Sequence, residues 1–311
     1  MLRYSADQRT LAFVTAYFAF TAFAWYWHPT QWYFIVPMVM LLCVLSFLCA
    51  IIIHNTVHVP IFRSKDANKV FQVILSLSYG HAVSAYVPGH NFSHHQNTQS
   101  ASDDIRTDKL RFRWNFLNQL LFFFVVSGDI IKGEIRFAKR TWKEKPSWFN
   151  QYMLELVIVM GLKIALLIIN WKLAVLYIII PHQYAVWGIV STNYWQHDGC
   201  DETHEYNHSR SFTSKGLNWF TFNNGYHGAH HLKPGVHWSL LPAFHNEMIA
   251  PHLHPNLNRK YLVPYLWTTC IYPGKRIDYL GNPVVLKPIM ENVDWVPSVK
   301  MSNNLQMGVE I

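Results

Sequence analysis

Long hydrophobic runs alternate with polar stretches along the chain, and the four clearest runs come in two pairs. Within each pair the connection is only a few residues long, which favours a helix that enters a membrane and a second that returns. A helix needs about 20 mainly apolar residues to cross the hydrocarbon core. The pattern therefore predicts an all-α integral membrane protein with two transmembrane helical hairpins. The expected spans are residues 11–27, 32–53, 152–169 and 172–192, with turns at 28–31 and 170–171.

Two other apolar stretches, residues 70–88 and 114–131, are interrupted by polar side chains. We interpret both as amphipathic helices that lie against the membrane, as such patterns favour. If both crossed it instead, the protein would have six spans. Glu155 and Lys163 interrupt the third predicted span. Because a charge at mid-bilayer costs about 2.5–3.5 kcal/mol on insertion scales, Lys163 is expected to have a partner or to reach the interface.

Two hairpins place residues 54–150 and 193–311 on one side of the membrane, where they would form a cap on a single domain, 1–311. The N-terminal segment and these two regions hold 24 of the 26 Lys and Arg residues. Basic loops favour the cytoplasmic side, so the cap is predicted to be cytoplasmic. Nucleic acid is not expected as a partner, because no basic stripe accompanies a recognisable binding motif.

Composition changes this picture mainly through histidine. The chain has 18 His residues although only 14% of its residues are charged. Its four Cys residues form no CxxC pair, which argues against a disulfide framework or a thiolate metal site. Imidazole is therefore the candidate metal ligand.

Nine of the histidines fall into four clusters, each beside a predicted span or interfacial helix. Residues three or four apart share one face of a helix, so each multi-histidine cluster is expected to aim its rings at one point. One zinc site needs three or four protein ligands, whereas nine suit two metals. All-imidazole, two-metal chemistry indicates non-haem iron. The predicted ligands are His54, His58, His90, His94, His95, His197, His227, His230 and His231.

Polar residues close to these clusters could orient the ligands. A metal-bound His usually donates its second N–H to a carboxylate or a carbonyl group. Asp104 and Asp198 are the acidic candidates for this role, and Asn193 could hold a water molecule near the metals.

These motifs resemble those of the membrane fatty acid desaturase superfamily, over roughly residues 30–250. The most specific stretch is NNGYHGAHHLKPGVHWSLLPAFH, residues 223–245, which is similar to the third histidine box of bacterial-type desaturases. The first box matches His54 and His58, and His197 matches the isolated histidine of NYWQHDG. The second box departs from the acyl desaturase pattern: HxxxHH at residues 90–95 is closer to the alkane hydroxylases.

The resemblance implies two iron ions that use O2 and externally supplied electrons to introduce a double bond into a fatty acyl chain, linked to a lipid or a thioester. A hydroxylase or ketolase acting on an alkyl or isoprenoid chain is the alternative on this scaffold. A membrane zinc hydrolase and a metal transporter are further rivals. No rubredoxin-like, iron–sulfur or dinucleotide motif is visible, so the expected electron donor is a separate protein of ferredoxin, rubredoxin or cytochrome type.

Overall fold

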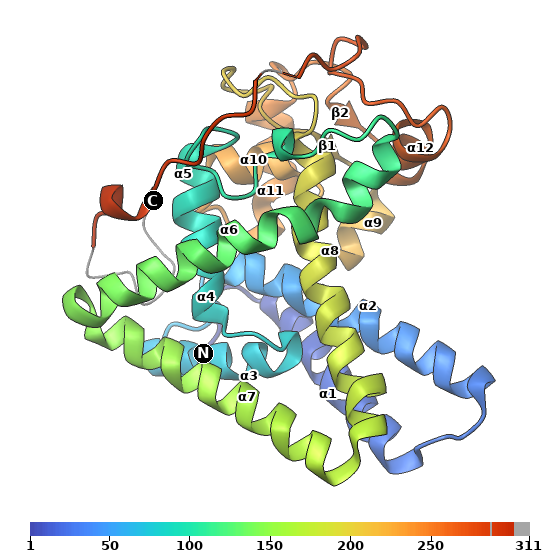
Figure 1. Ribbon diagram of the computed structural model, residues 1–311, viewed down its shortest axis with the longest axis vertical. Coiled ribbons are helices and arrows are strands. Elements are labelled where there is room, and N and C mark those ends of the chain that lie inside the picture. Colours follow the sequence, from blue (N-terminus) through green and yellow to red (C-terminus); the bar gives the residue numbers. More distant parts are fainter. Residues whose placement is uncertain (287, 302–311) are drawn as a thin grey trace. The chain divides into compact units, whose positions relative to one another are not determined.

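The computed structural model describes residues 1–286 and 288–301, which are mostly helical (Figure 1). Among them, the one sheet consists of two short parallel strands, β1 (Ser211–Phe212) and β2 (Asn258–Arg259). The all-α prediction is confirmed. Internal contacts divide the chain into two compact units, Met1–Val87 with Ala138–Ile189, and Pro88–Phe137 with Val190–Lys300. The single domain expected from the sequence stays a prediction.

The first unit contains most of the apolar helices. Its elements are α1 (Asp7–Trp27), α2 (Trp32–Thr56), α3 (Lys65–Tyr79), α4 (Val83–Val87), α7 (Pro146–Ala174) and a π-helix (Val175–Ile179). Two helices continue from one unit into the other, α6 (Asn115–Glu144) and α8 (Ile180–His197).

Four helical runs in the described chain are long and apolar enough to cross a membrane: Asp7–Trp27, Trp32–Thr56, Asn115–Glu144 and Pro146–His197. A fifth would be Lys65–Tyr79 with Val83–Asn97, a pair bent by 85°. The expected number of about four apolar spans is confirmed. The set of helices differs, because α6 meets the criterion of length and hydropathy although we expected it to lie on the membrane surface. Helix α6 meets it through its first part, because the apolar stretch before residue 132 is long enough to supply a window with few charges.

The last of these runs has 52 residues, far more than the roughly 20 that one crossing needs. Asn170 breaks it, since its φ of −157° and ψ of 94° are not helical. The turn predicted at Asn170-Trp171 is therefore present. In Figure 1 the chain reverses direction between α7 and α8.

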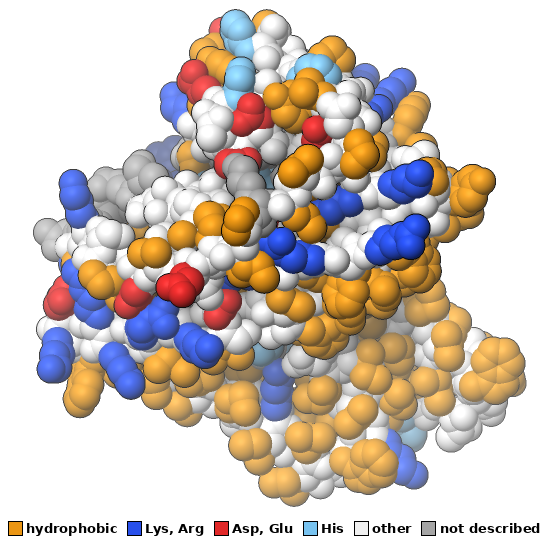
Figure 2. Space-filling view, turned by 45° about the horizontal axis from the view of Figure 1, so that its top comes forward, with side chains coloured by type: hydrophobic (Ala, Val, Ile, Leu, Met, Phe, Trp, Pro, Cys, Tyr) orange, Lys and Arg blue, Asp and Glu red, His pale blue; other side chains and the backbone are white. Residues whose placement is uncertain are grey.

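Large apolar side chains cover the surface of the long helices. On α2, Met40 is 63% exposed, whereas Leu42, two residues later, is fully buried. On α7, Val157 and Ile164 are exposed in the same way. Figure 2 shows hydrophobic side chains gathered on one such surface. Exposed apolar area of this extent is typical of helices that contact lipid.

The charges inside α7 have polar partners within the first unit. Glu155 accepts hydrogen bonds from the Ser84 backbone N–H (2.8 Å) and hydroxyl (3.0 Å). The Lys163 ammonium donates to the Gly80 carbonyl at 2.7 Å, which supplies the partner expected for it. Gly80 has a φ of +81°, and an added Cβ would lie 2.3 Å from the His182 ring. Only glycine fits this turn without strain.

The second unit is built from short helices and long loops. Besides the strands, it contains a π-helix (Pro88–His94), α5 (His95–Asn97), α9 (Lys215–Phe220), α10 (His227–Leu232), α11 (Leu241–Phe244), α12 (Leu262–Leu266), two π-helices (His245–Ile249, Trp267–Ile271) and three 3-10 turns (Thr107–Lys109, Trp238–Leu240, Val296–Ser298). An apolar core of Ile105, Leu110, Phe122, Val126 and Tyr194 joins α6, α8 and the loop that precedes α6.

Candidate metal centre

The second histidine box lies where the backbone changes from α-helix to π-helix. Residues Pro88–His94 form the π-helix, in which residues five apart rather than four are stacked. His90 consequently pairs with His95, and their Nε2 atoms are 3.2 Å apart. His94 projects elsewhere, towards His231, with an Nε2–Nε2 distance of 3.2 Å. The expectation that His90 and His94 aim at one point is wrong, because the π-helix replaces the α-helical register.

The third box is divided in a similar way by α10. His227 and His231 are four residues apart and lie in one group, whereas His230 points to another. An α-helix has about 3.6 residues per turn, so the successive residues His230 and His231 point about 100° apart and cannot serve one group, while His227 stays with His231. The expectation that all three aim at one point is therefore wrong as well.

The loop before α10 fixes where that helix begins. A Cβ added at Gly225 would lie 2.2 Å from the Phe212 carbonyl oxygen, so the backbone approaches β1 at a distance that only glycine permits. The Asn218 side chain accepts from the Gly225 N–H and donates to the Phe212 carbonyl, which ties this turn to the strand. His227, two residues after Gly225, is the first residue of α10.

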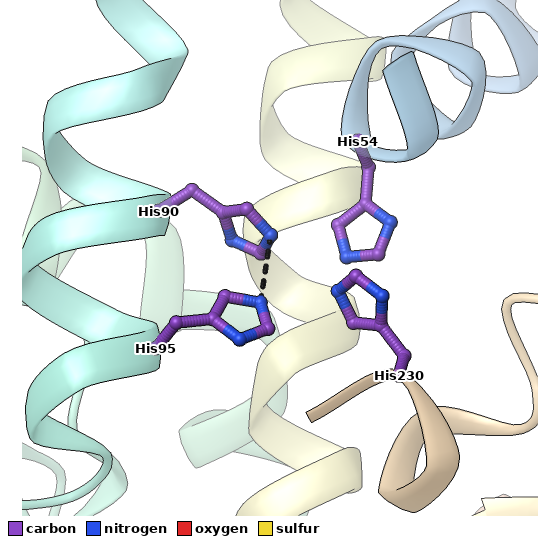
Figure 3. Close-up of side chains that lie close together, drawn as sticks. All are labelled: His54, His90, His95 and His230. Carbon is purple, nitrogen blue, oxygen red and sulfur yellow. Dashed lines mark hydrogen bonds between the residues drawn. The ribbon is translucent and has the colours of Figure 1, made fainter. Parts of the chain in front are cut away.

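Within the second unit the histidines thus form two groups, which we call group A and group B. Group A contains His90, His95 and His230, and Figure 3 shows their rings turned toward one another from the π-helix, α5 and α10. Group B contains His94, His197, His227 and His231. In each group the candidate ligand nitrogens lie within 4.8 Å of one another.

The two groups are adjacent. The rings of His95 and His231, one from each group, are stacked with their centroids 4.2 Å apart. His230 and His231 follow one another in the chain, and their ring centroids are 5.9 Å apart. Two cations held by these groups would therefore be close neighbours.

The geometry of group B fits a metal ion. His197 and His227 approach to 2.8 Å between their Nε2 atoms. Two nitrogens that bind one ion at about 2.1 Å, at right angles, are about 3 Å apart. A cation between them would stabilise lone pairs that otherwise face each other. The spacing of His94 and His231 is similar.

Hydrogen bonds on the outer ring nitrogens set the direction of two ligands in group B. The His94 Nδ1–H donates to the Asp103 carboxylate at 2.9 Å, and both side chains are fully buried. The His197 Nδ1–H donates to the His208 carbonyl at 3.0 Å. Since Nδ1 carries the proton in each ring, the Nε2 lone pair faces the group, as a metal requires.

Electrostatics keep the surrounding imidazoles neutral. The pKa of His231 lies well below its usual range, mainly because the ring is buried and also because neighbouring histidines repel a positive charge there. Burial also lowers the pKa of His208 to about 4. Neutral imidazole is the form that binds a metal, so the protonation state of this region suits a cation.

The polar residues predicted to orient ligands have other partners. Asp104 accepts from the Trp295 indole N–H at 2.8 Å, and Asn193 donates to the Ile105 carbonyl at 3.0 Å. Asp198 binds Arg276, whose Nε donates to its carboxylate at 2.8 Å. The residue that contacts a candidate ligand is Asp103, which the sequence analysis missed. Its position beside Asp104 was the one available signal.

The first box lies in the first unit. His54 is in the last turn of α2, and His58 follows two residues after the helix ends. Their ring centroids are 6.0 Å apart. His58 belongs to neither candidate metal group found among the described residues. Its role as a ligand stays a prediction.

Comparison with known proteins agrees with this arrangement. Residues 30–263 match a protein family described as fatty acid desaturase. The matched stretch covers most of the chain and contains all nine predicted histidine ligands. No curated protein matches the chain. The match extends over far more than half of the sequence and includes both histidine groups. The chain therefore belongs to the fatty acid desaturase family.

Proposed function

We propose that this protein is an O2-dependent, di-iron desaturase that introduces a double bond into a fatty acyl chain, linked to a lipid or a thioester. The observation that carries the proposal is the pair of adjacent all-histidine groups in a chain of the desaturase family. Imidazole binds iron well, and two groups supply ligands for two ions.

We assign the nine histidines of the four clusters as ligands. Group A would take His54 as a further ligand, supported by the match of the first box to residues 54 and 58. His58 is assigned on that match alone. Asp103 and the His208 carbonyl would hold their histidines in the metal-binding tautomer. Of the residues first considered for that role, Asp198 acts through Arg276, and Asp104 and Asn193 support the loop around Ile105.

The overall reaction is balanced by an external reductant. Two adjacent methylenes would lose one hydrogen each, and one O2 with two electrons and two protons would give two water molecules. Iron supplies the oxygen chemistry when it is bound. The protein holds the ions and fixes which carbon faces them. A separate carrier of ferredoxin, rubredoxin or cytochrome type would deliver the electrons to a cytoplasmic cap.

The test is expression in a host that provides a suitable donor, followed by mass spectrometry of total fatty acids and lipids. New species that lack two hydrogen atoms, absent with a His94→Ala variant, would support desaturation. A purified protein with about two iron ions per chain and little zinc would support the di-iron assignment and exclude a zinc hydrolase.

A hydroxylase or ketolase is the second candidate, and one observation favours it. The second box has the spacing HxxxHH, which resembles the alkane hydroxylases. The same mass spectrometry separates the two, because a hydroxylated product gains one oxygen atom. Products that carry oxygen and no new alkene would overturn the proposed desaturation while preserving the metal assignment.

A further inference from the structure

Two ligands of group B depend on segments that are far apart in sequence. His94 is oriented by Asp103, in the loop that follows α5. His197 is at the C-terminal end of α8 and is followed directly by Asp198. The ring centroids of His94 and His197 are 4.8 Å apart. Their spacing therefore requires that the loop and the end of α8 keep a fixed separation.

The backbone of the loop holds Asp103 firmly. Its carboxylate accepts from the Gln99 N–H at 2.8 Å and from the Ile105 N–H at 2.9 Å, besides the bond to His94. Any displacement of this loop would therefore carry the carboxylate, and the His94 ring, with it.

Arg276 connects this loop to the end of α8. Its guanidinium donates to the carbonyls of Leu110 (2.7 Å) and Thr107 (3.0 Å), at the end of the loop. It also donates from Nε to the Asp198 carboxylate at 2.8 Å. Only 10% of the Arg276 side chain and 4% of the Asp198 side chain are exposed. The planar guanidinium of arginine can donate to all of these acceptors at once, whereas a lysine ammonium would not reproduce this set of hydrogen bonds.

The backbone next to Arg276 also contacts the end of α8. The Tyr279 N–H donates to the Gly199 carbonyl at 2.7 Å. Gly199 has a φ of +69°, and an added Cβ would lie 2.4 Å from the Ile277 carbonyl oxygen. The segment 276–279 is therefore seated closely on the turn that follows His197. It lies beyond residue 263, where the match to the family ends.

We propose that Arg276 is a positioning residue that sets the separation of His94 and His197, and with it the metal affinity of group B. It acts through Asp198 on one side and through the loop of Asp103 on the other. The inference rests on the proposed function only in requiring that the two groups bind metal ions. Group A has no ligand on the end of α8 and should be unaffected.

The experiment is a titration of the metal-free, detergent-solubilised protein with Co2+, monitored by its ligand-field absorption. In Arg276→Gln, one of two sites should bind about 10–100-fold more weakly, the usual cost of losing an outer partner of a metal ligand. The other site should keep its affinity. Arg136→Gln is the matched control, because Arg136 also pairs with an aspartate, Asp294, but is 42% exposed.

Three further measurements separate positioning from a general structural role. Thermal unfolding of the metal-free variant reports any loss of stability that is independent of metal. Asp198→Asn should weaken the same site, and the double variant should bind no more weakly than either single variant. Arg276→Lys should restore little of the affinity. If Arg276→Gln does not insert, Asp198→Asn provides the same test.

Unchanged Co2+ affinity in Arg276→Gln would overturn the inference, as would equal weakening of both sites. Additive effects in the double variant would also overturn it. If the wild type has two Co2+ sites and Arg276→Gln binds Co2+ with wild-type affinity, the proposed function stands and only this inference is overturned. A wild type that binds no metal would instead overturn the proposed function, and the inference with it.

Discussion

Replacement of Asp103 by Asn is the sharpest test of how the ligands of group B are oriented. The Asp103 carboxylate accepts three hydrogen bonds, from the His94 Nδ1–H and from two backbone N–H groups, and donates none. Asn has a single acceptor oxygen, so its amide nitrogen must face one of these donors. If it faces His94, the ring must move its proton to Nε2, and the metal-binding lone pair is lost.

The size of the effect can be worked out in two ways. A hydrogen bond to a charged group contributes about 1.5–3 kcal/mol. Loss of an outer partner of a metal-bound His lowers affinity about 10–100-fold, which is about 1.4–2.8 kcal/mol. The two estimates agree. Asp103→Asn is therefore expected to raise the apparent Kd of one metal site by one to two orders of magnitude.

The assay is titration of the metal-free protein with Fe2+ without oxygen, together with iron content after purification. Asp66→Asn, which changes an exposed aspartate at the start of α3, is the control and should bind as the wild type does. If Asp103→Asn bound both ions with unchanged affinity, the carboxylate would have no orienting role, and the reasoning would be refuted.

Further predictions concern stability and the remaining histidines. Gly80→Ala should destabilise the protein by at least about 1–2 kcal/mol, the cost of a left-handed backbone, and the clash with His182 should add to this loss. Gly161→Ala, where an added Cβ would meet open space, should not destabilise it. Thermal unfolding of both variants checks these predictions. Burial raises the pKa of Asp104 to about 6, above its unfolded value near 4, so the folded state holds the extra proton between these values. The contribution of Asp104 to the free energy of unfolding should therefore fall by about 2–3 kcal/mol as pH rises from 4 to 7, whereas the buried histidines contribute in the opposite direction. The difference in unfolding free energy between the wild type and Asp104→Asn isolates this contribution, and a difference that does not change with pH would contradict the assignment. His252→Ala should keep full iron content and activity, because the ring is exposed and lies at a tilt against the Tyr206 ring.

The membrane helices were predictable because apolar length is a local property of the chain. The turn at Asn170 was predictable for the same reason, from two polar or interfacial residues between hydrophobic runs. The extent of α6 was not, because the apolar stretch ends at residue 131 and the helix continues through a strongly charged segment to Glu144.

The histidine residues were identifiable from their spacing, but their division between two groups was not. His90, His94 and His95 would share one face of an α-helix, and only the π-helical register separates them. Sequence spacing assumes a register that this segment does not have. A pattern of four-residue repeats therefore located the candidate ligands without showing which of the two groups each would join.

The choice between Asp103 and Asp104 was equally beyond the sequence. Neighbouring residues in a loop can point in opposite directions, and here the bonds from Gln99 and Ile105 decide which one faces His94. The partner of Asp198 is 78 residues away at Arg276. Contacts over that distance follow from the fold and leave no periodic signal.

Both short helical segments that carry these candidate ligands supply a ring to each group, and this would couple two bound ions. The first cation to arrive would fix the rotamers of one or more rings on each segment and so limit the motion of the remaining ones. Binding of the second cation would then cost less conformational entropy, because some of the rings would already be ordered. An ion bound at one group should accordingly favour binding at the other, while each group keeps its own intrinsic affinity.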